Sequence, residues 1–241
     1  MDEITFHTRL HRPGTMLDAG AHDGLLTIPF ARLPHSRVLA FEPLPSAFAR
    51  LEDAVRAAFG AIPPHVALHR AALGDAAGEI TLAMPVVEGV VHEQWASMVK
   101  DFSTHAASGV TVRTATAPLL RVDDLGLTDL THAKLDAEGA EYEVLRGARE
   151  TLLRCRTVMT LEVEERHREG STWAVPAYLD ALGYDVFFEV RDEWLPVAAL
   201  DRATMQRASP DPTVFAASDP YVFIFYALPR EASAAMLDRL R

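Results

Sequence analysis

With 241 residues, 49% of them hydrophobic and 24% charged, the chain has the size and composition of one large α/β domain with its own core. Its formal net charge of −11 argues against nucleic acid or an anionic membrane as the main partner. Cys155 is the single cysteine, which excludes an intrachain disulfide, and the first residues contain no apolar run of the signal-peptide kind. We therefore expect a cytoplasmic protein.

Short apolar segments followed by glycine, proline or acidic residues indicate buried strands in the first half of the chain. The expected elements are strands at 16–17, 37–41 and 66–69, helices at 25–33 and 46–59, and a hairpin over 71–84. Segment 85–117 shows little periodicity, and a connection of that length in a compact domain is often a substrate loop or lid.

The second half continues the alternation of strands and helices. The expected elements are a strand ending near 136, a helix after 139, a strand at 157–163, a helix at 172–182, and a terminal antiparallel pair at 184–190 and 221–227, with loop over 191–219. This order predicts a doubly wound, mostly parallel sheet in a single domain spanning 1–241, with a core of about 15–190. Such sheets bind ligands beyond the carboxyl ends of their strands.

The turn after the first strand reads Asp18-Ala-Gly-Ala-His-Asp-Gly24. Its glycines let the backbone approach a ligand, but the spacing Gly-x-x-x-Gly differs from that of a pyrophosphate cradle. Asp18 and Asp23 suit the zwitterionic amino-acid tail of a ligand beside a sulfonium, with Asp18 accepting from the ammonium. An ordinary strand–helix turn is the alternative. Glu42 ends the second strand, where a carboxylate can accept both ribose hydroxyls of a nucleoside.

The most informative segment is Lys134 to Ala148, which reads KLDAEGAEYEVLRGA. It delivers Asp136 and Glu138 at the end of a buried strand, and acids crowded in that position are costly unless they bind something. Glu141 and Glu143 fall in the first turn of the following helix, where acids are normal, so we expect them to cap the turn and the helix.

A second group of acids follows the next strand. Glu162 and Glu164 share one face by the period of two, and His167 comes soon after. In one interpretation Asp136 or His167 is a general base, and Glu162 and the other acids hold substrate hydroxyls. In the other, a divalent cation such as Mg²⁺ is held by Asp136, Glu138, Glu162 and His167. Ion pairing or a solvated charged face would explain the same residues without either function. Candidates in the substrate loop are His92, Trp95, Ser97, Lys100 and His105.

The motifs DAGAHDG, FEPLPSAF, LHRAALGD, Ser97-Met98 and KLDAEGAEYEVLRGA occur in an order that closely resembles the FkbM family of methyltransferases, over roughly residues 15 to 165. The resemblance implies a class I (Rossmann-like) methyltransferase fold and S-adenosylmethionine as cofactor. It also implies methyl transfer, usually to oxygen, on a small molecule such as a sugar, polyketide or other secondary metabolite. The residues expected to bind the cofactor are Asp18, Gly20, His22, Asp23, Gly24, Glu42, Pro43, Asp75 and Ser97.

Two other functions fit part of the pattern. A NAD-dependent oxidoreductase would use Glu42 in the same way, because the ribose of either nucleoside offers two hydroxyls. The glycine spacing and the acidic turn count against it. A non-catalytic module that only binds a nucleoside is the other alternative.

Overall fold

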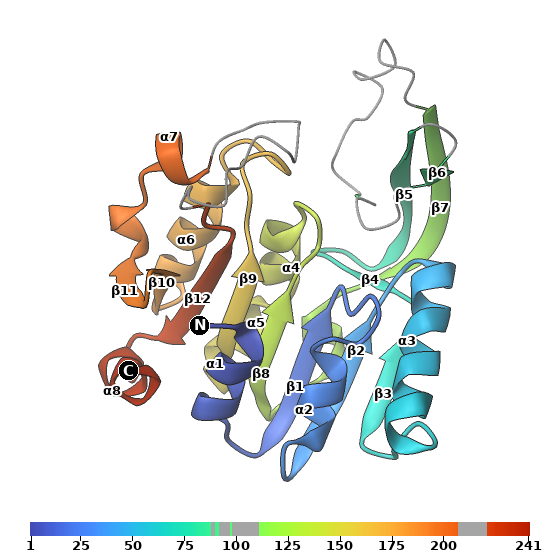
Figure 1. Ribbon diagram of the computed structural model, residues 1–241, viewed down its shortest axis with the longest axis horizontal. Coiled ribbons are helices and arrows are strands. Elements are labelled where there is room, and N and C mark those ends of the chain that lie inside the picture. Colours follow the sequence, from blue (N-terminus) through green and yellow to red (C-terminus); the bar gives the residue numbers. More distant parts are fainter. Residues whose placement is uncertain (88–89, 92–96, 98–110, 207–220) are drawn as a thin grey trace.

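The computed structural model describes residues 1–87, 90–91, 97, 111–206 and 221–241. Figure 1 shows an α/β fold with one large, mostly parallel sheet and a smaller sheet beside it, which confirms the expected fold class. Within the described part of the chain, every helix is too short or too polar to cross a bilayer.

The large sheet has eight strands in the order β11-β10-β12-β9-β8-β1-β2-β3. Their bounds are β1 Gly14–Ala19, β2 Ser36–Phe41, β3 Val66–His69, β8 Leu130–Leu135, β9 Val158–Glu162, β10 Tyr184–Val190, β11 Glu193–Pro196 and β12 Ile224–Pro229. The strands from β3 to β9 are parallel neighbours, whereas β12, β10 and β11 pair antiparallel. The expected antiparallel pair is therefore present as β10 and β12. The edge strand β11 corrects the expectation that 191–219 is only loop.

Successive residues of the central strands point to opposite faces of the sheet, and each face is covered by helices. Leu17 of β1 belongs to a core cluster with residues of α4 (Glu141–Gly147), α5 (Arg149–Cys155) and α6 (Ser171–Ala181). Met16 packs instead on α2 (Thr27–Arg32). On that second face also lie α1 (Glu3–Leu10), α3 (Pro45–Phe59) and α8 (Ser233–Leu240). The sheet is therefore doubly wound.

The smaller sheet has the order β4-β7-β5-β6, with β4 Ala72–Leu73, β5 Gly78–Val87, β6 Val90–Val91 and β7 Thr111–Leu120. The expected hairpin over 71–84 is wrong, because β4 and β5 lie on opposite edges of β7, where Ala72 and Gly78 both pair with Leu119. Strand β7, some forty residues after β4 in sequence, is thus the neighbour of β4 in place of the expected β5. The expectation that 85–117 is loop is also corrected at both ends, where β5 continues to Val87 and β7 begins at Thr111.

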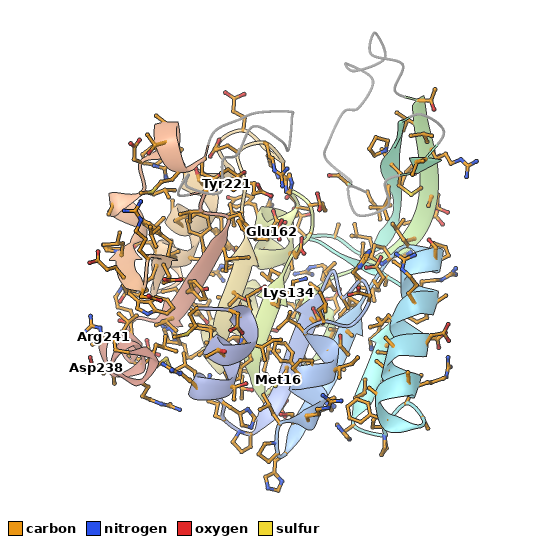
Figure 2. The ribbon with its side chains drawn as sticks, in the orientation of Figure 1. Met16, Lys134, Glu162, Tyr221, Asp238 and Arg241 are labelled. Atoms are coloured by element: carbon orange, nitrogen blue, oxygen red, sulfur yellow. The ribbon has the colours of Figure 1, made fainter. Side chains whose placement is uncertain are left out.

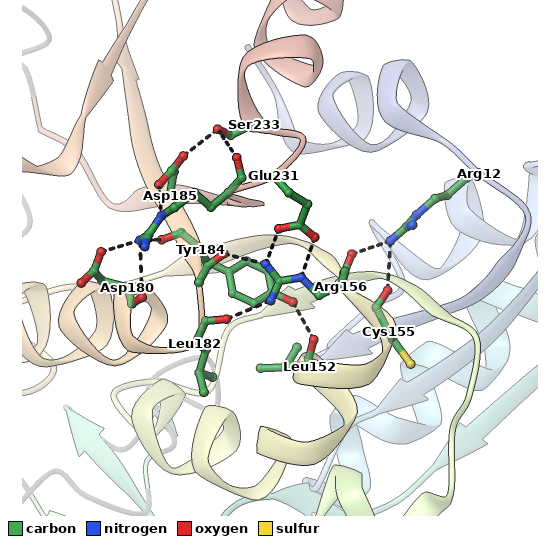
Figure 3. Close-up of polar contacts among 12 residues, drawn as sticks. Arg12, Leu152, Cys155, Arg156, Asp180, Leu182, Tyr184, Asp185, Glu231 and Ser233 are labelled. Atoms are coloured by element: carbon green, nitrogen blue, oxygen red, sulfur yellow. Dashed lines mark hydrogen bonds and ion pairs between the residues drawn. The ribbon is translucent and has the colours of Figure 1, made fainter.

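Polar contacts join the turns at the end of the sheet where strands β9 and β10 begin (Figure 3). Arg156 follows α5 in a left-handed conformation, and its guanidinium donates to the carbonyls of Leu182 (2.8 Å) and Gly183 (2.6 Å) and to the carboxylate of Glu231 (2.7 Å). It also lies 4.7 Å from the centroid of the Tyr184 ring. One side chain therefore joins the turns before β9, before β10 and after β12.

Two histidines are buried between α1 and the sheet. The Nδ1 atoms of His7 and His132 are 3.1 Å apart, and His7 Nε2 lies 3.1 Å from the Thr160 hydroxyl. Burial lowers the pKa of His7 to about 3 and is the main cause that lowers the pKa of His132 to about 2. Both are therefore neutral in the folded protein, whereas an unfolded chain protonates a histidine near pH 6.5. Their contribution to stability is complete above that pH and is lost as the pH falls below it.

We predict that His7→Gln weakens the acid sensitivity of folding. Because one fewer group takes up a proton on unfolding, the wild type should lose about 1.4 kcal/mol more unfolding free energy than the variant between pH 7.5 and 5.5. Urea unfolding at the two pH values measures this difference. His35→Asn, which removes an exposed histidine, is the control and should behave as the wild type does. An equal loss in the wild type and His7→Gln would show that His7 is charged in the folded protein.

Candidate active site

The carboxyl ends of β1, β2, β8 and β9 border a cavity of about 420 Å³. This volume lies within the range of about 300–1,000 Å³ that is usual for small-molecule sites. The cavity spans the point between β1 and β8 where the strand order reverses, which is where open α/β sheets bind their ligands. Its wall beside β2 and β4 is largely apolar and includes Phe41 and Leu73, whereas its wall beside β8 and β9 carries Asp136 and Glu162.

Gly20 brings three strands together at the floor of the cavity. Its φ is +75°, and a Cβ at this position would lie 1.9 Å from the carbonyl oxygen of Asp136. Its N–H donates to the carbonyl of Phe41 (3.0 Å). The turn after β1 therefore touches the ends of both β2 and β8, which only glycine permits.

Glu42 is fixed at the end of β2 on the cavity wall. Its carboxylate accepts from the backbone N–H of His22 (3.0 Å) and of Leu44 (2.9 Å). Burial raises its pKa, against the opposing effect of these two backbone hydrogen bonds. The carboxylate has lone pairs beyond those two, and its orientation is set before any ligand arrives. His22, Asp23 and Pro43 line the cavity beside it.

Lys134 is the cation around which the acids of β1 and β8 are arranged, and Figure 2 shows it near the end of β8. Its Nζ donates to the carbonyl of Gly20 (2.8 Å) and to Asp136 (3.1 Å), and lies 3.9 Å from Asp18. Burial opposes the charge of Lys134, but the acids Asp136, Asp18 and Glu3 outweigh it and raise its pKa. The side chain is therefore charged and partly neutralises a group of carboxylates.

Asp18 lies behind this lysine and is almost fully buried, with 1% of its surface exposed. One carboxylate oxygen accepts from the Thr27 hydroxyl (2.6 Å), and the other, Oδ1, has no hydrogen-bond partner among the described residues. Burial raises the pKa of Asp18, and Lys134 and Thr27 oppose that effect. The predicted binding of a ligand ammonium would therefore take place beside Lys134.

Glu138, Glu162 and His167 form a compact cluster at the ends of β8 and β9. One ligand atom from each lies within 4.8 Å of the others, and His167 Nε2 is 3.5 Å from Glu138. Burial is the main cause that raises the pKa of Glu162 to about 9, helped by the charges of Asp136, Glu164 and Glu138. Glu162 therefore carries a proton at neutral pH. Asp136, the fourth residue predicted to bind a metal, is instead paired with Lys134.

The pKa of Glu164 is lowered, whereas that of Glu162 is raised, although only two positions separate the two residues. Burial opposes its ionisation, but its contacts with Arg166 (2.6 Å), His167 (3.2 Å) and the Tyr221 hydroxyl outweigh burial and lower its pKa. Tyr221 lies above Glu162 in Figure 2. Glu164 is therefore an ionised, fully bonded carboxylate that positions His167.

Comparison with known proteins agrees with this geometry. The profile of the methyltransferase FkbM domain matches residues 18–186, which is more than half of the chain. The chain belongs to the FkbM methyltransferase family. No curated protein matches it significantly.

Several solved structures resemble this chain at low sequence identity. A methyltransferase FkbM from Methylobacillus flagellatus is 15% identical with a TM-score of 0.57, and the match covers 94% of this chain but only 48% of that protein. A precorrin-6y C5,15-methyltransferase from Geobacter metallireducens is 16% identical (TM-score 0.47, covering 93% and 86%). A SAM-dependent O-methyltransferase from Thermotoga maritima is 12% identical (0.47, 93% and 62%). The likeness to the FkbM structure, together with the strand order, shows that this FkbM-family chain has the class I methyltransferase fold.

The acids of the family motif KLDAEGAEYEVLRGA divide into two groups. Glu141 is buried, and its carboxylate accepts from the N–H groups of Ala137 (2.8 Å) and Gly139 (3.1 Å), while Glu143 pairs with Arg168 (2.5 Å). Glu141 therefore caps the turn as expected, whereas Glu143 pairs with Arg168 of the loop after β9 and does not cap α4. The turn that Glu141 holds leaves the motif's first two acids, Asp136 and Glu138, on the cavity wall.

Three predicted cofactor-binding residues do not line the cavity. Asp75 pairs with Arg146 of α4 (3.2 Å), and the Ser97 hydroxyl donates to the Glu138 carbonyl (2.7 Å). Gly24 closes the turn before α2 through a bond from its N–H to the Ala21 carbonyl (2.8 Å). The predicted substrate-loop residues His92, Trp95, Lys100 and His105 lie outside the described residues.

Sequence reasoning missed three charged residues of this FkbM-family cavity, namely Lys134, Arg166 and Glu3. Lys134 could have been found, because a strand of period two places it on the same face as Asp136. Glu3 gave no signal, because α1 reaches the cavity through tertiary packing against the sheet and α8.

We predict that Gly20→Ala destabilises this FkbM-family protein much more than Gly60→Ala does. Both glycines have a left-handed φ, +75° and +83°, but a Cβ at position 60 meets nothing within 4 Å. Gly60→Ala should therefore cost only the conformational strain of about 1 kcal/mol, whereas Gly20→Ala should cost at least about 2 kcal/mol more from overlap with the backbone. Chemical unfolding measures both. Equal losses would show that the contact between β1 and β8 has room for a side chain.

Proposed function

We propose that this chain binds S-adenosylmethionine in the cavity and transfers its methyl group to a hydroxyl of a small molecule. The observation that carries the proposal is the distribution of charge along the cavity. An apolar wall and the fixed carboxylate of Glu42 suit an adenosine at one end. The acids around Lys134 suit a sulfonium and its amino-acid tail at the other end. The residues present therefore fit the cofactor that the family resemblance implies.

The acids at the end of β8 and β9 fit the chemistry of methylating an alcohol. Displacement at a sulfonium needs an aligned nucleophile and a group that accepts the hydroxyl proton. Asp136 lines the cavity directly and is ion-paired with Lys134, so of the two predicted bases it is the better placed for this role. Glu162 carries a proton at neutral pH, so it serves to hold a substrate hydroxyl by hydrogen bonding. His167 contacts Glu138 and Glu164 and is not among the residues that line the cavity.

We also infer that a divalent cation can occupy the cluster of Glu138, Glu162 and His167. Two carboxylates and one imidazole within 4.8 Å of one another are a donor set that suits Mg²⁺ or Mn²⁺ better than zinc. Binding would displace the proton of Glu162, and the cation would acidify a substrate hydroxyl.

The acceptor class that we favour is a hydroxylated small molecule, such as a sugar, a polyketide or another secondary metabolite. The size of the cavity and the net charge of −11 both favour a small ligand over nucleic acid.

Titration calorimetry with S-adenosylmethionine, and separately with NAD⁺, tests the cofactor. We predict that the wild type binds the former and that Glu42→Ala weakens this binding about 10- to 100-fold, because a charged acceptor of hydrogen bonds is lost. Glu52→Ala, which removes an acid of α3 that pairs with Arg56, is the matched control and should leave the affinity unchanged. Tight binding of NAD⁺ in place of S-adenosylmethionine would refute the proposed function.

The cation is tested with Mn²⁺ alone. We predict that the wild type binds Mn²⁺ in calorimetry and that Glu138→Gln weakens the binding at least about tenfold, since losing even a residue that supports a ligand costs this much. Glu143→Gln is the control, because Glu143 belongs to the same motif but pairs with Arg168. Equal affinities in both variants would remove the cluster as a metal site.

A further inference from the structure

Helix α1 presents a polar stripe to the sheet. Glu3, His7 and His11 recur every four residues and therefore share one face of the helix. His7 meets His132 of β8 and Thr160 of β9, each at 3.1 Å, and the rings of His11 and His132 stack 6.0 Å apart. At the other end of the stripe Glu3 lines the cavity. The helix therefore connects the active-site cavity with a buried polar contact below it.

The hydrogen bonds of this stripe have one consistent direction. The Thr160 hydroxyl has a single hydrogen, which it donates to the Glu3 carboxylate. His7 Nε2 must then donate to Thr160, and His7 Nδ1 accepts from Nδ1 of His132. This order leaves only a lone pair on His132 Nε2 without a partner among the described residues. An unpartnered lone pair is less costly than an unpartnered N–H. Glu3 is thereby a hydrogen-bond acceptor at the end of the stripe that lines the cavity.

Glu3 is not needed to cap its own helix. Asp2 is the N-cap of α1, and its carboxylate accepts from both the N–H and the hydroxyl of Thr5, each at 2.8 Å. The Glu3 carboxylate instead interacts electrostatically with Lys134, which attracts it, and with Asp136 and Asp18, which repel it.

This end of the cavity has an excess of negative charge. The carboxylates of Glu3, Asp18 and Asp136 surround the single ammonium of Lys134, whose hydrogens go to Asp136 and to the Gly20 carbonyl. Burial raises the pKa of both Glu3 and Asp18. Such carboxylates are stabilised by a cationic ligand and not by a neutral one of the same shape.

We propose that Glu3 is a cofactor-binding residue that favours the cationic sulfonium of S-adenosylmethionine over the neutral thioether of its product, S-adenosylhomocysteine. This inference rests on the proposed function. It assigns a site role to α1, which precedes the family match over residues 18–186. Because methyl transfer removes the positive charge, Glu3 would lose its attraction for the cofactor once the reaction is complete, which favours exchange of product for substrate.

Calorimetry with the two cofactor forms on Glu3→Gln tests the proposal. The variant keeps the size of the side chain and its bond to Thr160 but removes the charge. We expect the affinity for S-adenosylmethionine to fall about tenfold, or about 1.4 kcal/mol, and the affinity for S-adenosylhomocysteine to stay unchanged. Asp2→Asn removes the same charge from the neighbouring residue of the same helix and should change neither affinity. Thermal unfolding of each variant checks that the fold is intact.

Three outcomes would overturn the inference. An equal loss for both cofactor forms would place Glu3 near the ammonium that they share. Unchanged binding of both in Glu3→Gln would remove Glu3 from the site while leaving the proposed function intact. A wild type that binds neither form would refute the proposed function itself, and the role of Glu3 would fall with it.

Discussion

The crowding of carboxylates around Lys134 is the constraint on which the rest of the site depends. Asp18, Asp136 and Glu3 come from three elements, and their mutual repulsion in a buried place would be costly without a central cation. Lys134 also bonds the Gly20 carbonyl, so the same ammonium ties the glycine turn to β8. Lys134 therefore stabilises both the conformation of the glycine turn and the carboxylates of the cavity.

The buried acids are satisfied in two different ways, and the difference separates acids bonded within the fold from acids that line the cavity. Glu141 accepts two backbone N–H groups, and Glu164 is bonded by Arg166, His167 and Tyr221. The donors to these two acids all come from the fold itself. Glu162 and Asp18 instead line the cavity, and Asp18 Oδ1 has no hydrogen-bond partner among the described residues. Acids that are incompletely satisfied at a cavity wall are the ones expected to meet a ligand.

The two ends of the strands in the large sheet make different kinds of contact. At the edge where β9 and β10 begin, Arg156 connects three turns through contacts made entirely within the protein. At the opposite edge the strands end in the turns that border the cavity. Helix α1 joins the buried part of the sheet to this second edge, since His7 packs against His132 while Glu3 reaches the cavity. The strand ends that Arg156 connects are therefore bonded within the protein, whereas the strand ends at the cavity offer polar groups to a ligand.

The sequence by itself determined the parallel core of the fold and the outline of the cavity. Apolar runs ending in Asp18, Glu42 and Asp136 gave the strands and placed these acids at one edge, because parallel strands end together. The tertiary structure decided the contacts between segments that are far apart in sequence. It paired β5 with β7 across some thirty residues, and it brought Glu3 to the cavity from a helix whose own sequence predicts no site. It also decided which acids hold a proton, because burial and neighbouring charge set a pKa, and both arise only when distant segments pack together.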